Sequence, residues 1–197
     1  FETASRNSSS GGRLPVLISV RPRAINNYLR ENLKKFAYAL VGVETLYRLS
    51  PDGQANPKVY ESLVRFLERL GESAEENLQV RMFQMELLGL AGFRFQTEQC
   101  WSCPNRFFEK ALFIAEKGGI FCGRCFQFEK PDLYLTEREL RELGILNAGQ
   151  AISNVQPAVE SVIDGFLKYV REREIKSSRF LQTLSQESQY GHAAEPK

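Results

Sequence analysis

The stretch CWSCPNRFFEKALFIAEKGGIFCGRC, residues 100–125, contains all four cysteines of the 197-residue chain. They form two C-x-x-C pairs, Cys100 with Cys103 and Cys122 with Cys125, separated by 18 residues. Two such pairs at this separation are typical of a structural zinc site, because each pair points two thiolates at one ion and Zn²⁺ prefers four ligands in a tetrahedron. We therefore predict one structural Zn²⁺ held by these four cysteines.

The residues between the two pairs predict a β-hairpin that returns the second pair to the first. Residues 110–116 are rich in apolar side chains, Lys117-Gly118-Gly119 has the composition of a turn, and Ile120-Phe121 leads directly into Cys122. Four thiolates leave no open position for water or a substrate, so such a site stabilises a small module and does not activate water.

Three other roles for the cysteines are open: two disulfides, an iron–sulfur cluster, or a thioredoxin-like redox pair. Disulfides need an oxidising compartment, and the chain shows no secretion signal. A redox C-x-x-C usually occurs alone, near a βαβ pattern. Structural zinc fits the pattern best.

Apolar residues with a helical period precede this module. One stripe, with spacings of 4, 3, 4, 3 and 4, comprises Leu29, Leu33, Phe36, Leu40, Val43 and Tyr47. It predicts one long helix over about residues 24–49 with the stripe in the core. Asn56-Pro57 predicts the start of a second helix. Ser73 with Glu76 forms a capping-box pattern for a third helix, over about residues 74–91.

Helical patterns also follow the module. Thr136 with Glu139 predicts a capped helix that ends near Leu143. Pro157 predicts the start of a further helix with an apolar face, and Phe180-Leu181 belongs to a last helical turn or two. Near the other end of the chain, residues 14–20 have strand character. The sequence thus predicts a mainly α fold, a helical bundle with an inserted four-cysteine zinc hairpin.

Composition limits the classes of function. The net charge of +2 permits a nucleic-acid partner without requiring one. No run approaches the roughly 18 apolar residues of a membrane span, so we expect a soluble protein with no membrane partner. His192 is the only histidine, no cysteine is spare as a nucleophile, and no phosphate-binding glycine motif occurs. We predict that the protein is not an enzyme.

Three further stretches resemble the C-terminal part of RecO, the bacterial DNA repair and recombination mediator family. LRENLKKFAYALVGVETLYRLSPDGQANPKVYESLVRFLERL (residues 29–70) is similar to its long helix, N-P helix start and following helix. LQVRMFQMELLGLAGF (78–93) resembles its R-x-F-E-x-x-L-L helix, although Gln84 stands where glutamate is common. VIDGFLKYVREREIKSSRFL (162–181) resembles its closing basic segment, and the cysteine pairs stand where the family places them.

The resemblance implies a domain organisation. Residues 1–20 are expected to be a remnant of an N-terminal OB-fold, its last strand or strands, in a chain that begins at Phe1 as a fragment. Residues 21–99 and 126–185 are the two parts of a helical domain, on either side of the zinc module at 100–125, and 186–197 are a flexible tail.

The resemblance also implies a function: mediation of homologous recombination in the RecF pathway, in the bacterial cytoplasm at the nucleoid. The expected partners are single- and double-stranded DNA, the C-terminal tail of single-stranded-DNA-binding protein, RecR and, indirectly, RecA, with annealing of complementary strands. The alternative is a zinc-stabilised protein-interaction module without direct DNA contact.

Two sets of side chains are candidates for these contacts. Phosphates need basic partners, and the basic residues at the OB-fold junction and on the closing segment are Arg21, Arg23, Arg30, Lys34, Lys35, Lys176 and Arg179. An acidic peptide tail with an apolar end needs an apolar groove with a cation at its rim. We expect Arg81, Met82 and Met85 to form that groove.

Overall fold

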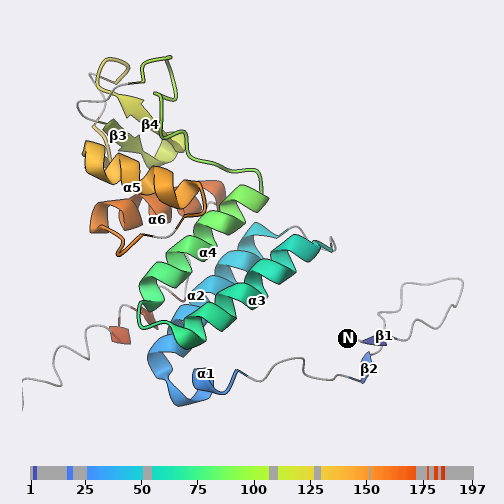
Figure 1. Cartoon of the computed structure of the whole chain (residues 1–197). Coiled ribbons are helices and arrows are strands. Elements are labelled where there is room, and N and C mark those ends of the chain that lie inside the picture. Colours follow the sequence, from blue (N-terminus) through green and yellow to red (C-terminus); the bar gives the residue numbers. More distant parts are fainter. Residues whose placement is uncertain are drawn as a thin grey trace, which may run out of the picture.

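The computed structural model of the chain describes residues 2–3, 17–19, 26–50, 55–106, 111–126, 130–150, 152–171, 177, 180–181 and 183–184. Over these residues the fold is mainly helical, with a small antiparallel sheet between the fourth and fifth helices (Figure 1). Helices α2 (Leu33–Leu49), α3 (Pro57–Glu72) and α4 (Glu76–Leu90) lie side by side, and α5 (Glu137–Asn147) and α6 (Pro157–Arg171) lie between them and the sheet (Figure 1). None of the helices in the described ranges is both long enough and apolar enough to cross a membrane.

Two short strands precede the helices. β1 (Glu2–Thr3) pairs antiparallel with β2 (Leu17–Ser19), which lies within the stretch predicted as a strand. That these strands are the remnant of an OB-fold stays a prediction.

The first helical segment is broken where the sequence predicts one continuous helix. α1 (Tyr28–Glu31) ends at Asn32, and α2 (Leu33–Leu49) begins immediately after it. The Asn32 backbone is extended, with φ −129° and ψ 103°, and its side chain accepts a hydrogen bond from the Lys35 backbone N–H at 3.1 Å. Asparagine favours this non-helical N-cap conformation, which explains the break.

The prediction of the buried face of α2 is wrong. Most of the predicted stripe is exposed, by 37–76%, at Leu33, Phe36, Leu40, Val43 and Tyr47. α2 instead buries a face of mostly small side chains, which includes Ala37, Val41, Gly42 and Thr45. This face permits close packing: a Cβ at Gly42 would lie 2.4 Å from the Phe66 ring of α3. The helices therefore pack through the face that lets their backbones approach most closely.

α3 (Pro57–Glu72) begins as predicted, because the Asn56 side chain accepts from the backbone N–H groups of Lys58 and Val59. The capping box predicted at Ser73 is wrong. Ser73 is the C-cap of α3, and α4 (Glu76–Leu90) has Glu75 at its N-cap with no side-chain cap bond. Glu76 is buried and forms an ion pair with Lys34 at 2.9 Å, so its carboxylate is committed to α2.

The predicted hairpin is present. β3 (Ala111–Ile114) leads through a 3₁₀ turn, η1 (Ala115–Lys117), into β4 (Gly119–Cys122). A third strand, β5 (Leu133–Leu135), pairs with the other edge of β3 and was not predicted. The strand order is β4-β3-β5, all antiparallel.

The last two long helices complete one core. α5 (Glu137–Asn147) has the predicted capping box at Thr136 and Glu139, but it continues past Leu143. α6 (Pro157–Arg171) begins at the predicted proline. A single cluster of buried apolar side chains joins α2, α3 and α4 to the sheet, α5 and α6.

Part of the closing segment is tied to α2. The backbone N–H and the hydroxyl of Ser177 donate to the Glu44 carboxylate at 2.7 and 2.5 Å. The other oxygen of that carboxylate accepts two hydrogen bonds from Arg48. Residues from the two ends of the helical region are therefore in contact.

Candidate metal centre

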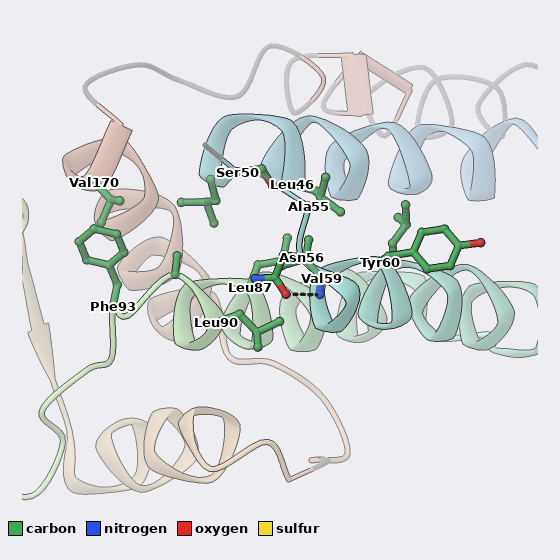
Figure 2. A pocket seen from close by; sticks show the side chains of 13 residues that line it. Leu46, Ser50, Ala55, Asn56, Val59, Tyr60, Leu87, Leu90, Phe93 and Val170 are labelled. Carbon is green, nitrogen blue, oxygen red and sulfur yellow. Dashed lines mark hydrogen bonds between the residues drawn. The ribbon is translucent and has the colours of Figure 1, made fainter. Parts of the chain in front are cut away.

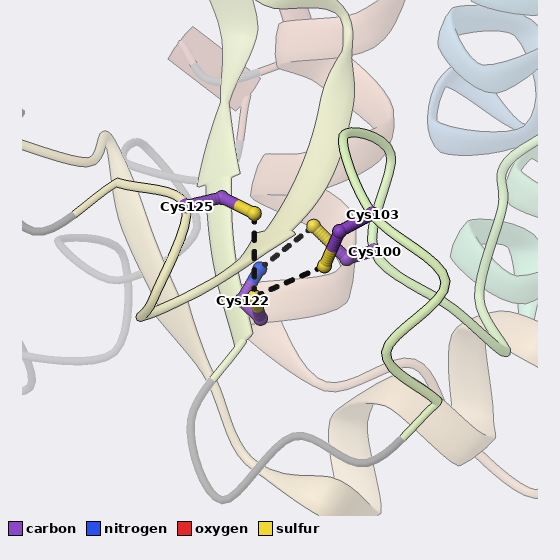
Figure 3. A group of neighbouring side chains, drawn as sticks. All are labelled: Cys100, Cys103, Cys122 and Cys125. Carbon is purple, nitrogen blue, oxygen red and sulfur yellow. Dashed lines mark hydrogen bonds between the residues drawn. The ribbon is translucent and has the colours of Figure 1, made fainter.

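The two cysteine pairs meet at one point (Figure 3). Cys100 and Cys103 lie on the loop before the sheet, Cys122 ends β4, and Cys125 lies on the turn that follows. Their sulfur atoms all lie within 4.8 Å of one another. Cys100 and Cys122 are buried and the other two are half-buried, so the group forms a closed site near the surface.

The sulfur spacing fits a single ion. The Cys122 sulfur lies 3.7 Å from that of Cys103 and 3.6 Å from that of Cys125. A tetrahedron of sulfurs about 2.3 Å from a central Zn²⁺ has sulfur–sulfur edges of about 3.8 Å. All four thiols are free, and a disulfide would need sulfurs about 2.05 Å apart. The geometry therefore fits four ligands around one metal ion rather than two disulfides.

Backbone hydrogen bonds shape each cysteine pair. The Cys100 N–H donates to the Asn105 carbonyl at 2.9 Å, and the Cys125 N–H donates to the Cys122 carbonyl at 3.1 Å. The Cys100 sulfur accepts from the N–H groups of Ser102 and Cys122 at 3.4 and 3.3 Å. Donors aimed at sulfur stabilise a thiolate, which is the form that binds metal.

The thiol pKa values reflect this crowding. Burial acts to raise the pKa of Cys122, but hydrogen bonds from Cys125, the Arg124 backbone and Cys103 outweigh it and lower that pKa to about 6. Hydrogen bonding with Cys103, burial and the other thiols raise the pKa of Cys125 above its ordinary value. The hydrogen bonds around Cys122 therefore favour its thiolate, which is the form that binds a metal ion.

The predicted DNA-contacting residues have different surroundings. Arg30 is exposed on α1. Lys34 pairs with Glu76, and that hydrogen bond raises the pKa of Lys34. Lys35 donates to the Gly71 carbonyl at 2.5 Å and lies over the ring of Tyr28. The other four, Arg21, Arg23, Lys176 and Arg179, lie outside the described residues.

Arg81 faces α6 instead of a peptide groove. Its side chain is only 12% exposed, and it pairs with Glu160 at 3.3 Å and with both oxygens of Asp164. It also donates to Gln84 at 3.1 Å. Burial acts to lower the pKa of Arg81, but these two carboxylates outweigh it and raise that pKa above its ordinary value. The side chain is held in a buried polar network between α4 and α6.

The other two predicted residues do line a groove, but with different cations. Met82 and Met85 lie in a groove of about 350 Å³ between α3, α4 and the end of α5. Its cations are Arg65, Arg69 and Arg94. Arg65 pairs with Glu86 at 2.6 Å. Arg65 and Arg69 are four residues apart on α3, so they lie on the same face of the helix. This spacing is the sequence signal that could have indicated a basic face on α3.

A larger cavity lies between the end of α2, the start of α3 and the end of α4 (Figure 2). It has a volume of about 690 Å³, and Phe93 and Val170 face each other at one side of it (Figure 2). Among the described residues, the polar residues in its lining are Ser50, Asn56 and Tyr60, and the rest are aliphatic or aromatic. Such a lining is suited to an apolar group.

The comparisons with known proteins agree with this architecture. The sequence profile described as "Recombination protein O C terminal" matches residues 30–179. The chain is 28% identical over 188 residues to the DNA repair protein RecO of Geobacter sulfurreducens, covering 93% of this chain and 75% of the relative. It is 26% identical over 166 residues to the DNA repair protein RecO of Pelobacter propionicus, covering 82% and 67%.

A third similar protein is the DNA repair protein RecO of Dehalococcoides mccartyi, 25% identical over 168 residues, with 80% of this chain and 65% of the relative covered. The chain thus spans 65–75% of the length of these three relatives. Because the profile covers most of the chain, including α2 to α6 and the four cysteines, the protein belongs to the RecO family of DNA repair and recombination proteins.

Proposed function

We propose that this chain is the zinc-stabilised, DNA-binding part of a recombination mediator of the RecF pathway. The observation that carries the proposal is the family match over residues 30–179. In this role the protein binds single- and double-stranded DNA and anneals complementary strands. It contacts the tail of single-stranded-DNA-binding protein and works with RecR to load RecA, in the bacterial cytoplasm at the nucleoid. The role involves no enzymatic step.

The metal in this proposal is one structural Zn²⁺ on Cys100, Cys103, Cys122 and Cys125. The all-sulfur ligand set and the sulfur spacing support this choice, because Zn²⁺ prefers four thiolates in a tetrahedron. A closed four-ligand site has no open position for a substrate, so the role of the ion is to hold the hairpin together.

DNA contact in this proposal comes from phosphate-binding basic residues. The candidates are Arg21, Arg23, Arg30, Lys34, Lys35, Lys176 and Arg179. Among the described candidates Arg30 is the most informative, because Lys34 and Lys35 already have partners within the protein. An Arg30 charge reversal therefore tests phosphate contact, whereas a change at Lys34 would also break its ion pair with Glu76.

Arg30→Glu is expected to weaken DNA binding. The slope of the logarithm of the binding constant against the logarithm of the salt concentration is expected to become shallower by about one, because one contact that releases a counterion is lost. Fluorescence anisotropy of labelled DNA at several salt concentrations measures both effects. Arg141→Glu is the matched control, because Arg141 is an exposed arginine on α5. No DNA binding by the wild-type protein at any salt concentration would instead favour the alternative, a zinc-stabilised protein-interaction module.

The groove with Met82 and Met85 is our proposed site for the acidic tail of single-stranded-DNA-binding protein. Methionines provide an adaptable apolar surface, and Arg69 and Arg94 provide cations at the same groove. Arg81, the cation predicted from sequence, contributes by holding α4 against α6.

Arg69→Glu is expected to weaken binding of an acidic, apolar-ended tail peptide by about tenfold or more, because a charge-assisted hydrogen bond becomes a repulsion. Titration of a labelled tail peptide measures this change. Arg141→Glu again serves as the control on an exposed arginine outside the groove. Equal affinities of wild type and Arg69→Glu would exclude this groove as the site.

A further inference from the structure

Trp101, the only tryptophan of the chain, is exposed on the first cysteine pair. Its side chain is 57% exposed, although a large apolar ring is usually buried. Its backbone N–H donates to the Ile120 carbonyl of β4 at 2.9 Å. A Cβ at Gly119 would lie 3.1 Å from the Trp101 Cγ and 3.3 Å from its Cβ, so the side chain lies directly against the glycine. The hairpin thus supports the base of the indole while most of the ring faces solvent.

A second exposed ring lies against the neighbouring glycine. Tyr169 of α6 is 46% exposed, and a Cβ at Gly118 would lie 2.2 Å from its Cε1. Gly118 has φ +60°, a conformation that favours glycine and ends the turn. The two glycines of the hairpin turn are therefore each covered by one exposed aromatic ring, and the two rings come from different elements.

The charges around these rings are mixed. Arg106, Lys117 and Arg124 are exposed on the same loop, turn and cysteine pair. Glu98 and Glu116 are exposed in the same segments. A partner attracted only by charge would gain little from this balance, so the distinguishing chemistry beside the first cysteine pair is the solvent-facing Trp101 ring.

From this arrangement we infer that Trp101 is a stacking platform for an unpaired base of single-stranded DNA. This inference rests on the DNA binding proposed above. Single-stranded nucleic acid is the partner that fits, because its bases present free π-faces whereas bases in a duplex are already stacked. Arg106 and Arg124, which are exposed on the same loop and cysteine pairs, can then contact the backbone phosphates.

Because the chain has one tryptophan, fluorescence excited at a wavelength that tyrosine does not absorb reports on this ring alone. Titration of the whole zinc-loaded protein with a short oligothymidylate is expected to quench the emission in parallel with binding. Anisotropy of a dye-labelled copy of the same oligonucleotide measures binding independently of the tryptophan. A duplex of the same length is expected to cause little quenching, since its bases are not free to stack.

Trp101→Ala is expected to weaken binding of the oligothymidylate about tenfold, which is about 1.4 kcal/mol. Trp101→Phe keeps an aromatic face and is expected to retain most of the affinity. Tyr60→Ala is the matched control, because Tyr60 is an exposed ring on α3, away from the hairpin. Metal content and thermal unfolding of each variant show whether the cysteine site is intact.

The outcomes separate this inference from the proposed function. Binding seen by anisotropy, with unchanged tryptophan emission and unchanged affinity of Trp101→Ala, overturns the stacking role and leaves DNA binding in place. Absence of binding by anisotropy overturns both. If Trp101→Ala and Trp101→Phe lose the same amount of affinity for the oligothymidylate and keep their metal, stacking is also contradicted, because phenylalanine retains an aromatic face.

Discussion

Cys122→Ser is expected to lower the free energy of unfolding by about 5 kcal/mol or more, because structural zinc supplies folding free energy directly. The loss is expected to extend beyond the hairpin. Ala111, Phe113 and Ile120 of the sheet belong to the same buried cluster as the helices, so a disordered hairpin would uncover the main core.

This prediction is tested by measuring the zinc content of the protein and its thermal unfolding with and without a chelator. The wild-type protein is expected to hold one zinc per chain and to unfold at a lower temperature after chelation. Ser102→Ala is the matched control within the same loop, because the Ser102 contact to Cys100 comes from its backbone N–H and survives the change. A metal-free wild-type protein whose unfolding is unaffected by chelator would refute the structural zinc site.

Arg81→Met is expected to lower the free energy of unfolding by about 3 kcal/mol, because it leaves two carboxylates without their buried partner. Glu160 and Asp164 would then repel each other beside α4, while the partial exposure of Asp164 limits the loss. Urea-induced unfolding measures the change. Arg141→Ala, which removes an exposed i,i+4 pair with Glu137, is expected to change stability by less than about 1 kcal/mol.

A charge-neutral variant separates the ion pairs from simple packing. Combining Arg81→Met with Glu160→Gln and Asp164→Asn is expected to restore part of the lost stability, because no unpaired charge is left. If Arg81→Met unfolds like the wild type but no longer binds the tail peptide, then Arg81 is a peptide-binding residue, as predicted from sequence, and not a structural one.

Several local patterns were predicted correctly because neighbouring residues decide the outcome. The spacing of the cysteines and the glycine turn predicted the hairpin and the cysteine cluster, and both are present. Asn56 and Thr136 were predicted as helix caps, and both accept the expected hydrogen bonds. These features depend on contacts within a few residues, so they can be derived from sequence alone.

Predictions failed where the sequence allows two alternative contacts and only packing selects one of them. α2 carries two apolar faces, and its period does not say which one is buried. The face with Gly42 is buried because it lets the Phe66 ring approach, which leaves Phe36 and Val43 exposed. Similarly, Glu76 was predicted to cap α4, but Lys34 is its partner across the helix pair.

The sequence by itself determined the helical class, the hairpin, the cluster of four cysteines and the family. Tertiary structure alone decided which charges are available to a partner, because ion pairing depends on residues far apart in the chain. It placed Arg81 between Glu160 and Asp164, about 80 positions away, and left Arg69 beside the two methionines. It also set Trp101 against Gly119 of the hairpin turn, with the ring facing solvent.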